Sequence, residues 1–378
     1  MLFRGLLNSS ALLSATVLLG FAPLCFAQNT SGNQSWTASS QQEDPDGGKN
    51  PTRTSETHTV VDGRVIDKTL VETLGPDGRY VPYSETEKES VRVNDTTVRS
   101  VERSFGRGAD GERTLIQEKQ EESQSLPGGE EKVVRTISNP DGNRVLQVVE
   151  RDLEHSKQLS PGARETTTTV LTPDGDGRLT PAVQTEQRET KSSDGIIDFR
   201  KTTQLSDGSG RWQLSEIREG TSKQENGQLV SKDERVLRPD SNGKLAVVER
   251  TVSKQTEAGP GEKRDTVETY STNVPGLAGD GSLQLVQRKT TIQNNASGKV
   301  STTQQVEQAN PGDPGADLHV TEKTIDIVQI GGSGTATEKR TILSPDADGQ
   351  LHEVWVDMGK TGNPSAIQVD TRPPAKPQ

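Results

Sequence analysis

The sequence predicts an all-β protein: an elongated antiparallel meander of about 18–20 strands, built from roughly nine hairpin repeats of ~34 residues, with disordered termini. A low apolar content, a recurring turn and polar segments between the turns lead to this prediction. Only 28% of the 378 residues are hydrophobic, against roughly 45–50% in globular domains by a broader count that includes Gly. Such a chain cannot bury a thick core, so it forms thin layers or stays disordered.

One loop type recurs along the chain. The run from Pro173 to Leu179 reads Pro-Asp-Gly-Asp-Gly-Arg-Leu, and the run from Pro345 to Leu351 reads Pro-Asp-Ala-Asp-Gly-Gln-Leu. Taking one glycine from each copy gives Gly78, Gly111, Gly142, Gly177, Gly210, Gly243, Gly281, Gly315 and Gly349. Successive glycines lie 31 to 38 residues apart, and a period of this length indicates a repeat architecture.

A second turn lies about halfway through each period. Asp and Asn tolerate the left-handed backbone region and Gly reaches it freely, so Asx-Gly pairs between polar segments predict hairpins. The segments between turns are rich in Thr, Val, Glu, Arg and Gln, and each is roughly ten residues long. The second turns are Asp62-Gly63, Pro127 to Gly129, Pro161-Gly162, Asp194-Gly195, Asn226-Gly227, Ser297-Gly298 and Gly331-Gly332.

Apolar residues flank the long loops. We expect cross-strand pairs of Leu171 with Leu179, Leu205 with Trp212, Leu237 with Leu245 and Leu343 with Leu351, each worth about 0.2–1 kcal/mol. Beyond them the strands turn polar. An acid or amide followed by a base recurs there: Glu118-Lys119, Glu150-Arg151, Gln187-Arg188, Glu249-Arg250, Gln287-Arg288 and Glu322-Lys323. The pattern predicts one narrow apolar stripe bordered by charged ladders.

The chain divides into four regions. Residues 1–27 are typical of a secretory signal peptide: Arg4 precedes an apolar run, and Cys25-Phe26-Ala27 fits a cleavage site that leaves Gln28 first. Lipid anchoring at Cys25 and a retained helix are the alternatives. We expect a disordered leader at 28–55, the β-hairpin repeat region at 56–358 and a disordered Pro-containing tail at 359–378. Cys25 is the only cysteine, so the mature chain would have no disulfide.

The charge distribution limits the partners. The formal net charge is −11, with acids and bases mixed throughout, whereas nucleic-acid surfaces need clustered Lys and Arg. We therefore expect no nucleic acid. We also expect no membrane insertion after signal cleavage, because a transmembrane barrel needs a lipid-facing apolar side and aromatic girdles, while these strands carry charge on both faces and few aromatics.

No catalytic or cofactor site is predicted. Asp174 and Asp176, like Asp346 and Asp348, resemble the start of a calcium loop, but a glutamate at the twelfth position is missing (Glu186 is the thirteenth). We read these four as weak metal candidates in ordinary turns, and expect no metal and no cofactor. The four histidines, at positions 58, 155, 319 and 352, lie far apart in the sequence.

These observations predict an exported protein, periplasmic or extracellular, that is not an enzyme. Its role would be structural, at a surface, or in binding an unknown protein or surface polymer. An exported enzyme or enzyme inhibitor with a site not visible in sequence is one alternative. A disordered polyampholyte surface protein is the other.

Overall fold

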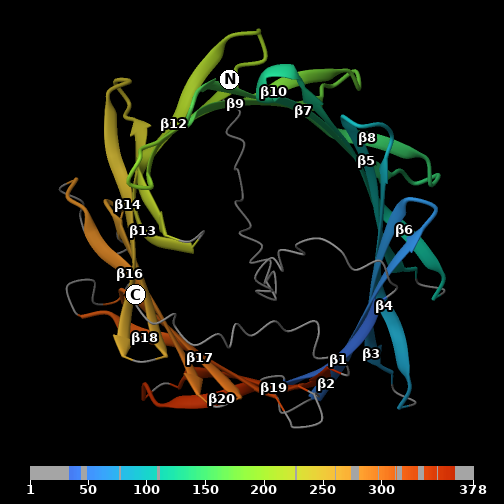
Figure 1. Ribbon diagram of the computed structural model, residues 1–378, viewed down its shortest axis with the longest axis vertical. Coiled ribbons are helices and arrows are strands. Elements are labelled where there is room, and N and C mark those ends of the chain that lie inside the picture. The colour runs from blue at the N-terminus through green and yellow to red at the C-terminus, as the bar shows by residue number, and fades with distance from the viewer. Residues whose placement is uncertain are drawn as a thin grey trace, which may run out of the picture. The chain divides into compact units, whose positions relative to one another are not determined.

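The computed structural model describes residues 34–43, 49–75, 78–108, 111–225, 228–259, 261–273, 281–296, 298–310, 312, 317–330, 336–346 and 348–361. These residues form one sheet of twenty strands, in which each strand pairs antiparallel with its neighbours in sequence. Figure 1 shows consecutive strands side by side in chain order. The predicted all-β antiparallel meander is therefore confirmed. The alternative of a disordered polyampholyte is not confirmed. Among the described residues, no helix is long and apolar enough to cross a membrane.

The strands are 10 to 15 residues long. The odd-numbered strands are β1 (Gln34–Glu43), β3 (Arg64–Leu74), β5 (Thr97–Arg107), β7 (Glu130–Pro140), β9 (Ala163–Pro173), β11 (Ile196–Ser206), β13 (Gln228–Pro239), β15 (Glu262–Ser271), β17 (Lys299–Gln308) and β19 (Ala336–Pro345). The even-numbered strands are β2 (Lys49–Val61), β4 (Tyr80–Arg92), β6 (Arg113–Leu126), β8 (Leu146–Ser160), β10 (Leu179–Lys191), β12 (Trp212–Glu225), β14 (Leu245–Gly259), β16 (Gln284–Ala296), β18 (His319–Ile330) and β20 (Leu351–Thr361). A short 3-10 turn, η1 (Pro127–Gly129), joins β6 to β7.

The turns are built as the sequence predicts. Asp62 and Gly63 both have positive φ, 52° and 74°, and they link the paired residues Val61 and Arg64, which is the geometry of a two-residue type I′ hairpin. Of the nine glycines that marked the period, seven have positive φ: Gly78, Gly111, Gly177, Gly210, Gly243, Gly281 and Gly349. Gly315 lies outside the described residues. Gly142 is the exception, because Arg144 holds the left-handed position in its loop, at φ 65°.

An aspartate holds five of the long loops together, whereas Gly75 and Gly108 occupy the equivalent position in the β3–β4 and β5–β6 loops. In the β9–β10 loop, Asp174 Oδ1 accepts hydrogen bonds from the backbone N–H groups of Asp176 and Arg178, both 2.9 Å. The same two bonds form around Asp141, Asp207, Asp240 and Asp346. Backbone N–H groups of Val145 and Asn143 lower the pKa of Asp141. The pKa of Asp141 is therefore lower in the folded than in the unfolded chain. The contact stabilises the fold at pH values above the ordinary carboxylate pKa, and this stabilisation is lost as the pH falls through the folded pKa.

We expect Arg144→Gly to stabilise the protein. A side chain in the left-handed region costs about 1–2 kcal/mol, and the equivalent position of the neighbouring loop is Gly177, at φ 77°. The free energy of unfolding should therefore rise by about 1 kcal/mol, as read from the urea midpoint. The reciprocal change, Gly177→Arg, should lower it by a similar amount. A midpoint that falls for Arg144→Gly contradicts this account.

Each period carries one β-bulge at the same depth. Every even strand from β4 to β20 has one extra residue where its register with the preceding strand shifts, and the extra residues lie 33 to 38 positions apart. They are Tyr83, Ile116, Val149, Ala182, Ser215, Val248, Val286, Thr321 and Val354. The residues on the preceding strand at the shift are Val71, Ser104, Ile137, Val170, Thr203, Val236, Thr269, Val306 and Ile342. We call these eighteen residues the bulge row.

The bulge row forms a narrow apolar stripe, but it consists of other residues than the loop-flanking leucines from which the sequence predicts one. Thirteen of its eighteen residues are apolar. The stripe is thin: among the described residues, Ile217 and Val236 are the buried apolar side chains, at 3% and 1% exposed, while Tyr83 and Ile116 in the row are 65% and 52% exposed. Backbone pairing and ion pairs therefore contribute more to this fold than a hydrophobic core does.

The predicted apolar pairs at the loops are wrong in register. Leu171 faces Pro181 and Leu179 faces Pro173, so the two leucines share a face but are offset by two residues. Leu205 and Trp212 lie on opposite faces, because Trp212 pairs with Ser206. The aspartate in each loop bonds its own backbone, and this fixes the loop closure independently of the leucines.

The leader prediction is also corrected. The range 28–55 contains β1 and the start of β2, which pair over ten residues. Asp46, Gly47 and Gly48 lie between the two strands and repeat the Asp-Gly turn signal, although β1 itself is mostly polar. The ladder with β2 satisfies the backbone groups of β1. At the other end, β20 extends to Thr361, three residues past the predicted boundary. The predicted signal peptide, residues 1–27, and most of the predicted tail lie outside the described residues.

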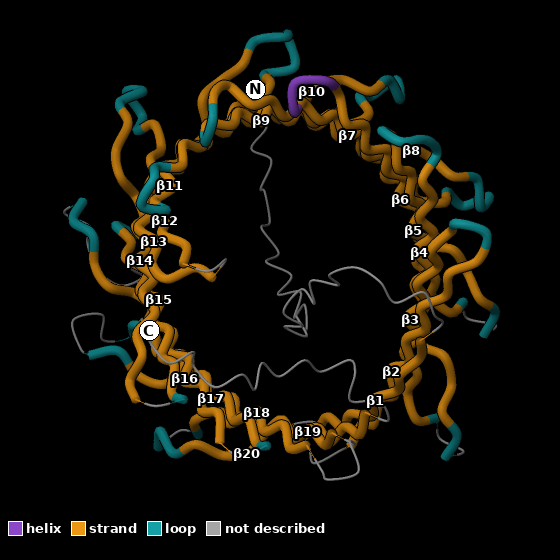
Figure 2. The backbone as a smooth tube through the Cα atoms, viewed as in Figure 1, coloured by secondary structure: helices purple, strands orange, loops and turns teal. Residues whose placement is uncertain are grey.

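The last strand meets the first. Ser40, Gln41 and Gln42 of β1 pair with Asp357, Val356 and Trp355 of β20. We call these three residue pairs the seam. The seam is a much shorter ladder than that of β1 with β2, which has ten residue pairs. Figure 2 shows β19, β20 and β1 in the same part of the sheet.

Candidate functional site

Cross-strand register sorts the side chains onto two faces. Directly opposed residues share a face, so Glu131 of β7, Ser156 of β8, Thr166 of β9 and Gln187 of β10 form one row across four strands. We call the face that carries this row the second face. The first face carries the alternate residues, such as Glu165 and Arg188.

Two adjoining hollows lie on this part of the second face. The larger has a volume of about 490 Å³ and lies beside η1 and the β8–β9 turn, while the smaller has a volume of about 260 Å³. Arg164 lines both, and together they form what we call the β7–β10 groove. Its walls are Ser125, Leu126, Gly129, Glu130, Glu131, Glu154, Ser156, Gln158, Gly162, Ala163, Arg164, Thr166, Gln187, Glu189 and Lys191.

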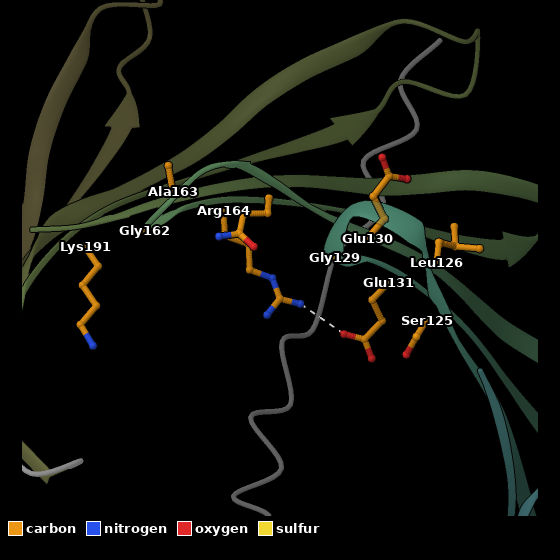
Figure 3. A pocket seen from close by; sticks show the side chains of 10 residues that line it. Ser125, Leu126, Gly129, Glu130, Glu131, Gly162, Ala163, Arg164 and Lys191 are labelled. Carbon is orange, nitrogen blue, oxygen red and sulfur yellow. Dashed lines mark hydrogen bonds and ion pairs between the residues drawn. The ribbon is translucent and has the colours of Figure 1, made fainter. Parts of the chain in front are cut away.

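The side chains of the groove are mostly polar and open to solvent. Figure 3 shows Glu131, Arg164 and Lys191 projecting to the same side of the sheet, while Glu130 projects to the other. Arg164 Nη2 donates to Glu131 Oε2 at 3.2 Å, with the two side chains 54% and 40% exposed. An ion pair this exposed stabilises the fold by less than about 1 kcal/mol, so both groups remain available to a ligand.

Hydroxyl and amide groups lie along the floor of the groove. Ser156 is 1% exposed, and its Oγ lies 2.8 Å from Oγ1 of Thr166. Gln187 Nε2 donates to Glu189 Oε1 at 2.6 Å. The charged side chains of the walls, four glutamates against Arg164 and Lys191, sum to −2. The groove therefore offers neutral hydrogen-bonding groups with a weak acidic bias.

Glycine shapes the rim of the groove. Gly162 has φ +83°, and a Cβ there would lie 2.7 Å from the carbonyl oxygen of Lys191. That approach allows the backbone N–H of Lys191 to donate to the Gly162 carbonyl at 2.7 Å. The same contact recurs two strands further on, between Gly195 and Gln224. It recurs again six strands further on, between Gly261 and Asn295. The mid-period turn of one hairpin thus bonds the end of the next hairpin.

Gly162→Ala should cost more than Gly177→Ala. Both residues have positive φ, but a Cβ at Gly177 meets nothing within 4 Å. Gly177→Ala therefore carries only backbone strain, about 1 kcal/mol, whereas Gly162→Ala adds a clash with fixed backbone and should cost about 1–3 kcal/mol more. Urea midpoints of the two variants measure the difference, and equal midpoints would show that the close approach contributes nothing.

Charged ladders cross the sheet on both faces, as the sequence predicts. Arg103 donates to Glu118 and Arg188 to Glu165, both at 2.7 Å. Arg250 pairs with Asp233 and Arg288 with Glu268. A hydrogen bond from Lys157 lowers the pKa of Glu165, and Arg188 lowers it further. The predicted acid–base couples do not bond within themselves, because adjacent residues such as Glu118 and Lys119 point to opposite faces.

The weak metal candidates sit in two separate loops. Asp174 and Asp176 belong to the β9–β10 loop, and Asp346 and Asp348 to the β19–β20 loop. Asp174 Oδ1 is engaged by its own loop. Asp346 Oδ2 lies 2.6 Å from His352 Nε2, and this hydrogen bond lowers the pKa of Asp346. Within the described ranges, no three His, Cys, Asp or Glu side chains are grouped so that they could hold a metal ion.

Sequence reasoning missed the partners of the histidines. Three of the four lie beside one carboxylate each: His58 with Asp67 at 2.6 Å, His155 with Glu130 at 3.2 Å, and His352 with Asp346. The first two pairs join different strands, and no local spacing identifies such partners. The groove was missed for the same reason, since its walls come from five consecutive strands, β6 to β10, and from η1.

Comparison with known proteins gives distant likeness only. No family model and no curated protein matches the sequence. The chain is similar to the siderophore receptor PirA from Pseudomonas aeruginosa, with 9% identity, a TM-score of 0.48, and coverage of 87% of this chain and 79% of that one. It is similar to the ferric enterobactin receptor PfeA from the same organism, with 8% identity, a TM-score of 0.45, and coverage of 88% and 81%. OpdL, also from that organism, shares 7% identity at a TM-score of 0.33, with coverage of 87% and 94%.

These neighbours contradict one expectation. The solved structures that the chain resembles also include a bacterial polysaccharide outer-membrane secretin, and we withdraw the expectation of no membrane insertion after signal cleavage. It rested on charge placement and on the small number of aromatic residues. Neither reports on backbone pairing, whereas satisfied backbone groups are the first requirement of a spanning sheet.

Proposed function

We propose that this chain is a non-enzymatic binding scaffold exported to the cell envelope, and that the β7–β10 groove binds a neutral, hydroxyl-rich polymer. The groove carries the proposal. It combines hydroxyls and amides of Ser156, Thr166, Gln158 and Gln187 on one face, with charges that nearly cancel. Such groups exchange hydrogen bonds with sugar hydroxyls without requiring a charged partner.

The repeat supports a scaffold rather than a catalyst. Each period presents the same strand pair, bulge and loop, and a stack of similar units gives an extended surface along which a polymer can lie. Catalysis needs a nucleophile, an acid or a base held at one place by supporting contacts. The prediction that the chain is not an enzyme is tested by a hydrolase screen of the purified protein, and robust turnover that Gln158→Ala abolishes would overturn it.

Titration with dextran, a neutral polysaccharide, tests the binding proposal. We expect saturable binding by calorimetry, and Gln158→Ala with Gln187→Ala should weaken it roughly tenfold, since each lost hydrogen bond is worth about 0.5–1.5 kcal/mol. The matched control is Gln213→Ala with Gln287→Ala, two glutamines outside the groove, and it should bind as the parent does. Polylysine binding that exceeds dextran binding, or equal loss in both double variants, rejects the groove as a site for neutral polymer.

A further inference from the structure

The seam is much shorter than the strands that form it. In its register the residue numbers of each pair sum to 397, so Trp36 to Glu43 of β1 face Thr361 to Val354 of β20, eight positions in all. Only the positions of Ser40, Gln41 and Gln42 pair, which leaves four facing positions on one side of them and one on the other without a ladder. The other strand neighbours pair over eight to eleven positions. Both ends of the seam therefore present facing edges on which the ladder is not formed.

Strand β1 has few of the features that block strand addition. Edge strands are usually protected by Lys, Pro or repeated charges. The ten residues of β1, Gln-Ser-Trp-Thr-Ala-Ser-Ser-Gln-Gln-Glu, contain neither Lys nor Pro, and Glu43 is their one charged residue. An unprotected edge of this kind accepts another strand through backbone hydrogen bonds alone.

We propose that the seam opens and that β1 of one chain pairs with β20 of a second copy, and β20 with β1, to give an exchanged dimer. The second copy is the matching occupant, because β20 is the strand that β1 already accepts in this register. Within one chain, the eighteen strands between β1 and β20 constrain how these two strands meet. A seam between two copies is free of that constraint. All eight facing positions can then pair in each of two identical seams. The exchange follows the rule for domain swapping, in which an existing contact is remade between protomers.

Cysteine crosslinks test the exchange directly. In a Cys25→Ser background, purified Gln41→Cys and Val356→Cys chains are mixed, incubated and oxidised. These residues are seam partners, and directly opposed positions bring Cβ atoms close enough for a disulfide. We expect a heterodisulfide with twice the molar mass of one chain. The matched control mixes Thr59→Cys with Ile66→Cys, partners in the ten-residue ladder of β2 and β3, which should remain uncrosslinked.

The double variant Gln41→Cys with Val356→Cys completes the test. When this variant is oxidised as a dilute monomer, a disulfide within one chain holds its seam closed. Light scattering should then show no dimer at any concentration. Three results overturn the proposal: a parent chain that stays monomeric on concentration, heterodisulfide no more abundant than in the control mixture, or a dimer that survives the lock. The last result would place the contact elsewhere on the chain.

Discussion

Gly220→Ala is expected to cause a large loss of stability, near the top of the ~1–3 kcal/mol range for overpacking. A Cβ at Gly220 would lie 1.9 Å from the carbonyl oxygen of Asp233 and 2.9 Å from the Cα of Glu234. Both atoms belong to the backbone of β13, so a side-chain rotation cannot relieve the clash. The urea midpoint and the far-ultraviolet β-signal measure the loss.

The surroundings of Gly220 explain why a glycine stands there. Phe199 of β11 and Glu234 of β13 are its cross-strand neighbours, and Lys232 Nζ lies 5.3 Å from the centre of the Phe199 ring. An aromatic side chain opposite a strand glycine compensates for the missing side chain. Gly106→Ala in β5 is the control, because its Cβ would make an ordinary 3.5 Å contact with Ile116. It should change stability by less than about 0.5 kcal/mol, and a comparable loss in both variants contradicts the explanation.

Removing one whole period should be tolerated far better than removing one strand. Deletion of residues 216–248 joins Ser215 to Glu249, which takes the place of its equivalent Glu216 directly after the bulge. It leaves eighteen strands, so the last strand still runs antiparallel to β1. Deletion of residues 226–239 removes β13 and the turn before it, so that the loop from Asp240 to Lys244 joins β12 to β14 and nineteen strands remain. The last strand then runs parallel to β1, and the seam cannot form in its present register.

We expect the whole-period variant to keep its β-signal per residue and a urea midpoint close to that of the parent. The one-strand variant should lose the seam, at about 3 kcal/mol for three residue pairs, in addition to the mismatch at the splice. Oxidation of Cys residues at positions 41 and 356 reports the seam in both variants. If the whole-period deletion unfolds the protein as severely as the one-strand deletion, stability is not a sum over similar hairpins.

The sequence predicted the hairpins because their signals are local. Asp174, Gly177 and their counterparts specify a loop within seven residues, and the backbone of each loop follows from the aspartate that bonds it. Arg144 shows the limit of the glycine pattern: Gly142 fits the motif, but the left-handed residue lies two positions later. The loop aspartate Asp141 is the more reliable marker of register.

The bulges, the groove and the seam could not be predicted, since each depends on pairing between segments. An extra residue such as Ile116 is recognised in a sequence when it interrupts an alternation of apolar and polar residues. These strands have Thr, Val and charged residues on both faces, so there is no such alternation to interrupt. The groove requires β7 to β10 in register. The seam requires β1, a mostly polar segment, to pair with β2 on one side and with the distant strand β20 on the other.

The thin apolar stripe also has a calorimetric meaning. Exposure of apolar surface raises the heat capacity on unfolding and exposure of polar surface lowers it. Because Val236 and Ile217 are the buried apolar side chains of the described region, the apolar contribution is smaller than in a domain with a thick core. The heat-capacity change should fall well below the usual ~12–15 cal/mol/K per residue. The curve of stability against temperature would then be shallow and broad, so that the same ladders of hydrogen bonds and ion pairs persist in cold and in warm surroundings with little change in free energy.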